Sequence, residues 1–204
     1  MIAAFRIWGL AVAGAAMQAA PAPAQVTWPD APVARGTLSF DGKSTLGDFT
    51  GTTTQVRGAM AGGAALHEVR GWVEAPVKTL ATGNDRRDRD LNKSMESAVY
   101  PTIRFELLGV TPDWQRGDSA GVVLNGNFVI HGVSRPEKIK ALLFRGPGGI
   151  HLTASTPMNL KNYKIGGLGK MLGILKMNPD IVVHVDLLFG EEKGSGKREE
   201  GSGC

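Results

Sequence analysis

The strongest constraint on the fold of this chain is an alternation of apolar and polar residues that begins at Ala34. Glycine, proline, asparagine and aspartate interrupt it at intervals of about ten residues, which is typical of an antiparallel meander. The stretch GVVLNGNFVIHG is the cleanest example, because Leu124, Phe128 and Ile130 share one face while Asn125 falls on the other. Successive side chains of a strand point to opposite faces. The pattern therefore predicts a sheet with one dry face and one wet face.

Eight strands are predicted, at residues 34–41, 48–60, 64–76, 101–113, 119–131, 134–145, 149–158 and 180–189. Two segments interrupt them. In the first, Leu91, Met95 and Val99 recur every four residues behind candidate N-caps at Asp85 or Asp88, which predicts a short amphipathic helix. The second, KNYKIGGLGKMLGILKMNPD, combines apolar residues with four glycines and is predicted to form a flexible apolar flap.

Antiparallel strands with one dry face can pack as a sandwich or close into a barrel, and the pattern does not choose between them. An eight-stranded barrel is just wide enough to be filled by side chains or to hold one elongated small ligand. Burying about a dozen methylene equivalents of such a ligand is worth on the order of 10 kcal/mol before association costs. An apolar barrel could therefore hold a lipid without any special chemistry.

The inward-facing side chains are the candidates to line such a cavity, or to fill it as plain core. The lining candidates are Phe105, Leu107, Val122, Leu124, Phe128, Ile130, Leu152, Val183 and Val185. The flap supplies a candidate lid, made of Leu168, Met171, Leu172 and Ile174. Just before the flap, Lys161, Tyr163 and Lys164 are candidates to contact a polar or phosphorylated head group at the mouth.

The N-terminal segment is typical of a secretory signal peptide. One positive charge at Arg6 precedes an uncharged, alanine-rich run, and small residues at Ala22 and Ala24 predict cleavage after Ala24. The run is short for a bilayer span of about 20 residues. We therefore expect residues 1–24 to be a signal peptide, residues 25–190 the barrel domain, and residues 191–204 a disordered, charged Gly/Ser tail. The single cysteine, Cys204, excludes an intrachain disulfide.

The letters GKST at residues 42–45 raise the question of a phosphate-binding P-loop. That motif needs a glycine five positions before Gly42, where this chain has Thr37, and a helix directly after it. The following residues are strand-like, so GKST is predicted to be a turn and nucleotide binding is not expected. The net charge of +4 is scattered rather than gathered in a stripe, which disfavours nucleic acid as a partner.

The four histidines show no metal-ligand spacing. His131, His151 and His184 fall on the polar face and are predicted to be solvated, while His67 shares the phase of Val69. No G-x-S-x-G elbow occurs in the sequence. The sequence therefore predicts no metal, no catalytic residues and no enzyme activity.

Four segments, in this order and spacing, resemble the YceI-like family of secreted bacterial proteins that bind lipids and isoprenoids. They are SFDGKSTLGDFTGTT, VKTLATGNDRRDRDLNKSM, YPTIRFELLGV and LNGNFVIHGVSRP. The later stretch DIVVHVDLLF resembles the family's closing strand, so the resemblance spans roughly residues 34–189. It implies an extended eight-stranded antiparallel barrel of lipocalin-like architecture, with the helix packed near one end. The flap is richer in glycine and methionine than is usual in the family.

The resemblance also implies a function: a periplasmic or secreted protein that carries or stores a long isoprenoid lipid inside the barrel. Its ligand would be an isoprenoid or a quinone, with no other cofactor. Two alternatives stay open, a soluble partner that presents quinone to a membrane cytochrome and an enzyme that acts on a lipid through His67. The oligomeric state also stays open, a dimer included.

Overall fold

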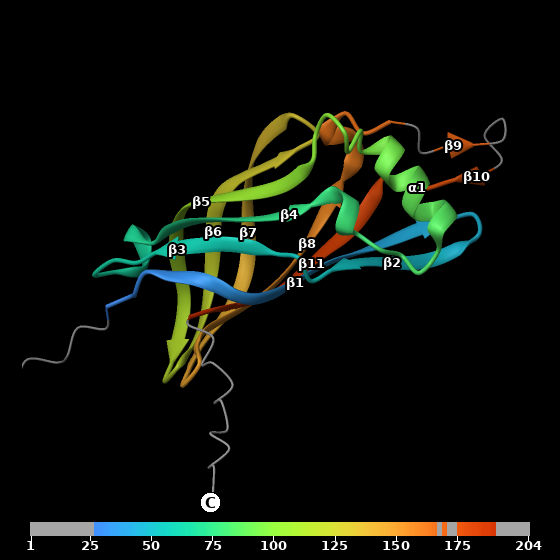
Figure 1. Ribbon diagram of the computed structural model, residues 1–204. Coiled ribbons are helices and arrows are strands. Elements are labelled where there is room, and N and C mark those ends of the chain that lie inside the picture. The colour runs from blue at the N-terminus through green and yellow to red at the C-terminus, as the bar shows by residue number, and fades with distance from the viewer. Residues whose placement is uncertain (1–26, 167–168, 171–174, 191–204) are drawn as a thin grey trace, which may run out of the picture.

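The computed structural model describes residues 27–166, 169–170 and 175–190, and it shows an elongated antiparallel barrel with one α-helix at one end (Figure 1). The strands are β1 Ala31–Ser44, β2 Gly47–Thr53, β3 Arg57–Ala61, β4 Arg70–Pro76, β5 Thr102–Arg116, β6 Ser119–Ile130, β7 Val133–Gly146, β8 Gly149–Asn159 and β11 Asp180–Phe189.

The strands follow the order β11-β8-β7-β6-β5-β4-β3-β1-β2, and a further pairing of β1 with β11 closes the sheet. The closing ladder is long, because it runs from Val33 opposite Phe189 to Asp41 opposite Val182. Closure leaves no open sheet edge along this seam. The prediction of an eight-stranded antiparallel barrel is therefore confirmed, and the sandwich is excluded.

β2 and β3 together occupy one position of the eight in the ring. β2 pairs with β1 from Leu38 to Ser44, whereas β3 pairs with β1 only at Ala31 and Pro32. The single strand predicted over residues 48–60 is therefore wrong, because the chain breaks between the two strands. At the break the buried Thr53 hydroxyl lies 2.7 Å from the hydroxyl of Thr79 in the 3-10 helix η2 Val77–Thr79. This contact holds the end of β2 against η2.

The strand predicted over residues 64–76 is correct only from Arg70 onward. Before it the chain forms the 3-10 helix η1 Leu66–Glu68, where the Glu68 carboxylate accepts hydrogen bonds from the backbone N–H groups of Ala64 and Ala65. The helical turn breaks the two-residue phase, so His67 is exposed instead of sharing the inward face of Val69.

The predicted helix is present as α1 Asp85–Ser94, but its N-cap is Asn84, whose side chain accepts a hydrogen bond from the Arg87 N–H at 3.0 Å. Leu91 and Met95 pack inward as expected. The expectation for Val99 is wrong, because that side chain is 67% exposed. The helix ends before it, and Glu96 adopts a left-handed φ of 45° that redirects the chain.

The flap region begins with the 3-10 helix η3 Leu160–Tyr163 and contains a two-stranded ladder, β9 Gly169–Lys170 and β10 Leu175–Lys176. Its C-terminal end is tied to the tip of β1, because the Asn178 N–H donates to the Lys43 carbonyl at 2.8 Å. The candidate lid residues lie outside the described residues: Leu168, Met171, Leu172 and Ile174. The letters GKST are the end of β1 and the start of its turn into β2.

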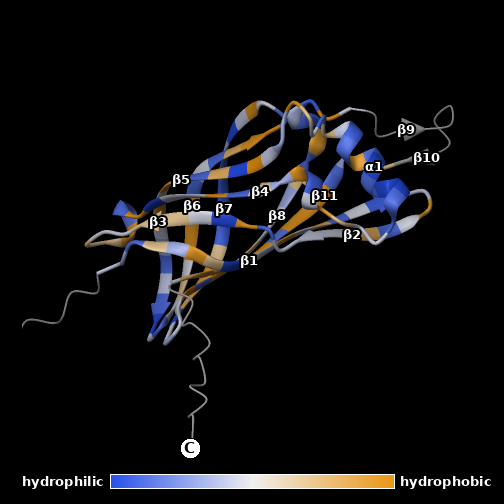
Figure 2. Ribbon diagram, viewed as in Figure 1, coloured by the Kyte–Doolittle hydropathy of each residue, from blue (hydrophilic) through white to orange (hydrophobic). Residues whose placement is uncertain are grey.

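Hydropathy follows the predicted pattern, with apolar residues recurring along every long strand (Figure 2). One buried cluster runs from Ala31 in β1 to Phe189 in β11, and β2 and β4 pack against it through the partly buried Phe49 and Val73. None of the helices in the described part of the chain has the length and apolarity needed to span a membrane.

Candidate ligand cavity

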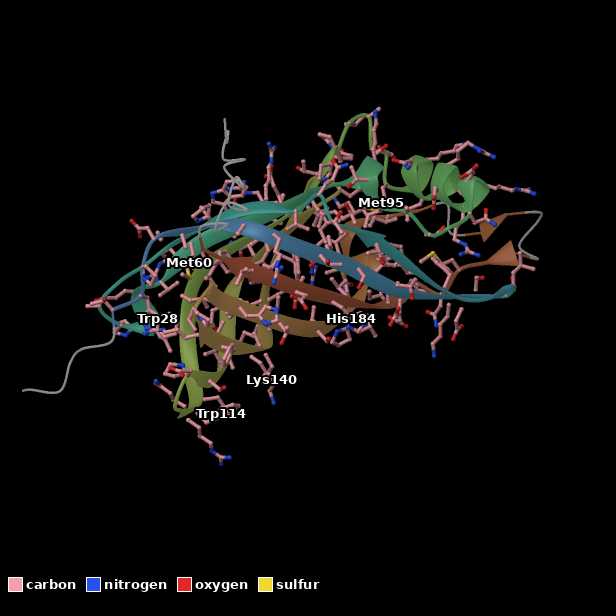
Figure 3. The ribbon with its side chains drawn as sticks, turned by 60° about the horizontal axis from the view of Figure 1, so that its bottom comes forward. Trp28, Met60, Met95, Trp114, Lys140 and His184 are labelled. Carbon is pink, nitrogen blue, oxygen red and sulfur yellow. The ribbon has the colours of Figure 1, made fainter. Side chains whose placement is uncertain are left out.

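The barrel encloses an inner chamber of about 100 Å³ with an almost entirely apolar wall. Trp28, Met60 and Leu66 line it. Figure 3 shows Trp28 and Met60 at the end of the barrel far from Met95 and the helix. The Arg145 guanidinium lies 4.6 Å from the centre of the Trp28 ring. At the roughly 30 Å³ that each water occupies in the liquid, this chamber has room for about three waters, although its wall offers them few polar partners.

An outer chamber of about 310 Å³ lies at the end of the barrel that carries α1. Its walls are the β1–β2 hairpin, α1 and the residues that flank the flap, with Phe49, Leu91 and Ile165 among them. This space exists because β2 pairs with β1 but with no other barrel strand in the described part of the chain. η2 and α1 cover the resulting gap instead.

The two chambers share four lining residues: Leu38, Ile103, Phe128 and Val183. The Phe128 ring packs against that of Phe105, with ring centres 4.9 Å apart and the planes tilted by 58°. These residues form the junction between the chambers. The interior therefore holds two adjoining apolar chambers along the barrel axis, which meet at these shared side chains.

The nine lining candidates from the sequence are inward or buried, but they lie at different depths. Phe105, Leu107, Leu124, Leu152 and Val185 line the inner chamber. Phe128 and Val183 line the junction, and Ile130 lines the outer chamber. Val122 is 2% exposed and packs in the core, and it is not among the described lining residues of either chamber. Their role in holding a ligand stays a prediction.

The three head-group candidates do not line the described chambers. Lys161 and Lys164 are exposed, and Tyr163 is 1% exposed. The Tyr163 hydroxyl lies 3.5 Å from a carboxylate oxygen of Glu137 on β7. Burial, and the Glu137 charge after it, raise the pKa of Tyr163 to about 12. Tyr163 is thus a packed residue at the end of η3.

Polar residues that sequence reasoning missed line the mouth of the outer chamber. They are Ser44, Thr45, Asn84, Arg86, Arg87, Asp90 and Ser94. The alternating charges of DRRDRD suggest a solvated surface, and they do not reveal which arginines face the cavity. The signal that could have found one is helical spacing, because Arg87, Leu91 and Met95 recur every four residues.

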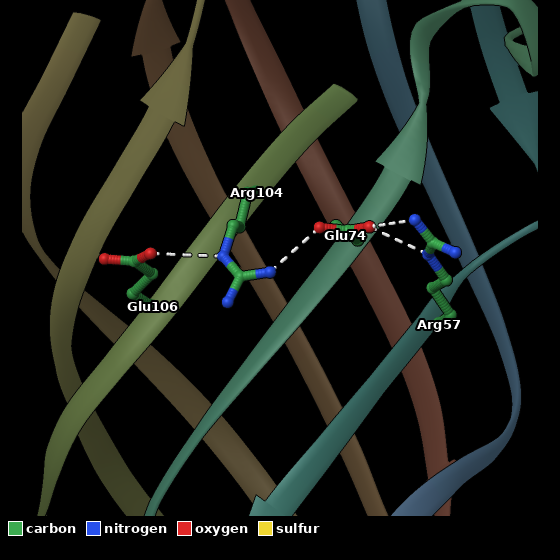
Figure 4. A network of polar contacts seen from close by, with 4 residues as sticks. All are labelled: Arg57, Glu74, Arg104 and Glu106. Atoms are coloured by element: carbon green, nitrogen blue, oxygen red, sulfur yellow. Dashed lines mark hydrogen bonds and ion pairs between the residues drawn. The ribbon is translucent and has the colours of Figure 1, made fainter. Parts of the chain in front are cut away.

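On the outer wall, four charged residues form a chain across β3, β4 and β5 (Figure 4). The Glu74 carboxylate binds Arg57 at 2.7 Å and Arg104 at 2.9 Å, and Arg104 also binds Glu106 at 3.1 Å. Burial alone would raise the pKa of Glu74, but its hydrogen bonds to Arg104 and Arg57 outweigh burial and hold that pKa below its usual value. The network fastens three strands together, and of its four members only Glu74 is among the described lining residues of the inner chamber.

Two of the three histidines predicted to be solvated lie on the outer wall. His184 contacts Ser155 at 2.7 Å and Asp41 at 2.9 Å, and Figure 3 shows it on the barrel's exterior. His151 contacts Asp186 at 2.6 Å. Both are partly exposed cross-strand pairs. Among the described residues, no group of three or more potential ligands could hold a metal ion.

The prediction for His131 is wrong, because its side chain is only 9% exposed. It stands in the β6–β7 turn with a left-handed φ of 51°, followed by Gly132 at 71°. This backbone is typical of a two-residue hairpin turn. The ring packs 4.6 Å from that of Tyr100, and Nδ1 lies 3.1 Å from the Tyr163 carbonyl oxygen. His131 therefore links the hairpin to η3.

Comparison with known proteins settles the family. The model of the YceI-like domain matches residues 30–189, which includes every barrel strand. This chain belongs to the YceI-like family. No curated protein matches the chain in sequence.

Solved structures share the fold of this YceI-like barrel at low sequence identity. A polyisoprenoid-binding domain from Saccharophagus degradans, implicated in plant cell wall breakdown, matches with a TM-score of 0.66 and 15% identity, over 81% of this chain and 99% of that one. Burkholderia cenocepacia BcnA matches with a TM-score of 0.63 and 11% identity, over 74% and 94%. A Campylobacter jejuni YceI protein matches with a TM-score of 0.54 and 16% identity, over 70% and 85%.

Proposed function

We propose that this protein binds one long isoprenoid lipid in the barrel, with the tail in the inner chamber and the head at the α1 end. The observation that carries this proposal is the pair of adjoining apolar chambers that share Phe128 and Val183 in their walls. The family, and the printed description of the Saccharophagus degradans domain as polyisoprenoid-binding, support the ligand class. The protein acts in this proposal as a carrier or store, outside the cytoplasm, and not as an enzyme.

The geometry favours an elongated ligand over a compact one. A compact apolar molecule would occupy one chamber and leave the other empty, whereas a flexible chain can pass the junction and contact both walls. Each methylene equivalent removed from water contributes about 0.8 kcal/mol. Affinity should therefore rise with chain length until the inner chamber is filled, and then level off.

A chain-length series tests this function. The chain, stripped of lipid, is titrated with farnesol and with progressively longer polyprenols, and intrinsic tryptophan fluorescence is followed. Trp28 lines the inner chamber, so its emission should change when a tail reaches it. We expect affinity to increase with length and the fluorescence change to occur only with the longer tails. Equal, weak binding of all lengths would contradict the proposal.

A further inference from the structure

The mouth of the outer chamber carries two arginines beside an apolar wall. Arg86 and Arg87 on α1 both line it, and Asp90 is the carboxylate among the described lining residues. Arg87 continues the stripe of Leu91 and Met95, which also line the chamber. The polar rim and the apolar wall are thus parts of the same surface of the helix.

The Arg87 guanidinium is held in place from the opposite side of the chamber. Its central carbon lies 4.2 Å from the centre of the Phe49 ring on β2. Stacking on an aromatic face leaves the edge of a guanidinium available for hydrogen bonds. Among the ion pairs found in the described residues, none includes Arg86 or Arg87.

A ligand that fills this chamber would cover the rim and remove water from both guanidinium groups. Covering a cation with a neutral head group is unfavourable, because the lost hydration is not replaced. An anionic head group replaces it, and the planar fork of arginine fits phosphate oxygens in a bidentate manner. The single carboxylate of Asp90 leaves the rim with more positive than negative side chains.

We infer that Arg86 and Arg87 form a head-group subsite for an oxyanion, so that the preferred ligand is a prenyl phosphate or diphosphate rather than a neutral prenol or quinone. This inference rests on the proposed lipid-binding function and specifies the class of its ligand. It also moves the head-group site from Lys161 and Lys164, which are exposed outside the described chamber walls, to the helix that covers the mouth.

The test compares two ligands with the same tail, geranylgeranyl diphosphate and geranylgeraniol, by calorimetric titration of the full chain as a bacterial host exports it. The variants are Arg86→Gln, Arg87→Gln and the double variant. Arg89→Gln is the matched control, because Arg89 lies on the same helix, is exposed and is not among the described lining residues. Thermal unfolding of each variant confirms that the barrel is folded.

We expect the unchanged chain to prefer the diphosphate, and the double variant to lose at least about tenfold of that affinity, as expected for lost charge-assisted hydrogen bonds. Geranylgeraniol should bind all variants equally, and Arg89→Gln should change nothing. Equal binding of the two ligands by the unchanged chain would overturn the subsite while leaving lipid binding intact. A loss of diphosphate affinity in Arg89→Gln as large as that in the double variant would also overturn the subsite. If neither ligand binds, the proposed function fails and the subsite with it.

Discussion

Filling the inner chamber with a larger side chain should exclude the end of a long lipid tail. Ala154 on β8 lines that chamber opposite Val185 on β11. Ala154→Leu adds three carbon atoms, which at about 0.8 kcal/mol each correspond to roughly 2.4 kcal/mol of apolar burial. Because the chamber has space, this burial should stabilise the ligand-free barrel. The same volume becomes unavailable to the tail, so affinity for a long polyprenol should fall by about fiftyfold.

Urea unfolding measures the first effect, and titration with farnesol and a long polyprenol measures the second. Farnesol, whose short chain occupies the outer chamber in this account, should bind the variant normally. The control is Ala61→Leu, because Ala61 is exposed on β3 and should change neither quantity. A variant that is destabilised, as overpacking of a filled core would be by about 1–3 kcal/mol, and that binds the long polyprenol normally would refute the reasoning.

Three further predictions concern the wall and the flap. The pKa of Glu74 is lowered in the folded state, so the stability that its charge contributes is present above about pH 4.5, the usual pKa, and is lost as the pH falls further. Glu74→Gln should remove this dependence of the unfolding free energy on acid pH, measured by urea unfolding. The same pH dependence in the variant as in the unchanged chain would contradict this prediction. The pKa of Tyr163 is raised to about 12, so the unfolding free energy should fall by roughly 2–3 kcal/mol as the pH rises from about 10 to 12. Tyr163→Phe should remove this fall in the unfolding free energy. A fall that persists in the variant would exclude Tyr163 as its source. A methyl group on Gly126 would clash with the Glu106 carbonyl oxygen and lie 2.6 Å from the Phe105 ring, so Gly126→Ala should lower the unfolding free energy by about 1–3 kcal/mol. Unchanged stability would show that the strands can separate there.

The barrel could be predicted because its strands differ on their two faces. Leu124, Phe128 and Ile130 are all buried, while Asn125 and Asn127 between them are partly exposed. This alternation can be recognised from adjacent residues alone and does not depend on tertiary contacts. The pattern alone did not separate a barrel from a sandwich, because the β1–β11 seam joins segments from opposite ends of the fold. The resemblance to the YceI-like family supplied that choice.

The errors lie where tertiary contacts override the local pattern. The break after β2 depends on Thr53 meeting Thr79, and the phase at His67 changes because Glu68 caps η1. By two-residue alternation His131 falls on the same face as the polar Asn125 and Asn127, but the hairpin turn folds its ring against Tyr100. The dipeptide His131-Gly132 at a strand end was a usable signal, since glycine favours the left-handed backbone of such turns.

The site could be predicted only in part, because alternation reports which face a residue occupies and not its depth along the barrel. Val122 and Leu124 share a face, yet only Leu124 is among the described residues of the inner wall. The outer chamber depends on α1 covering the gap beside β2, a long-range arrangement without a local sequence signal. Arg86 and Arg87 therefore look like surface residues until the helix is placed.

The most direct test of the account is native mass spectrometry of the chain exported by a bacterial host and purified without detergent, followed by organic extraction of whatever dissociates. The account predicts a complex of one chain with one isoprenoid lipid, and the mass of the extracted lipid identifies both its tail length and its head group. A ligand-free mass that persists after incubation with polyprenols, prenyl diphosphates and quinones would contradict lipid binding by this barrel.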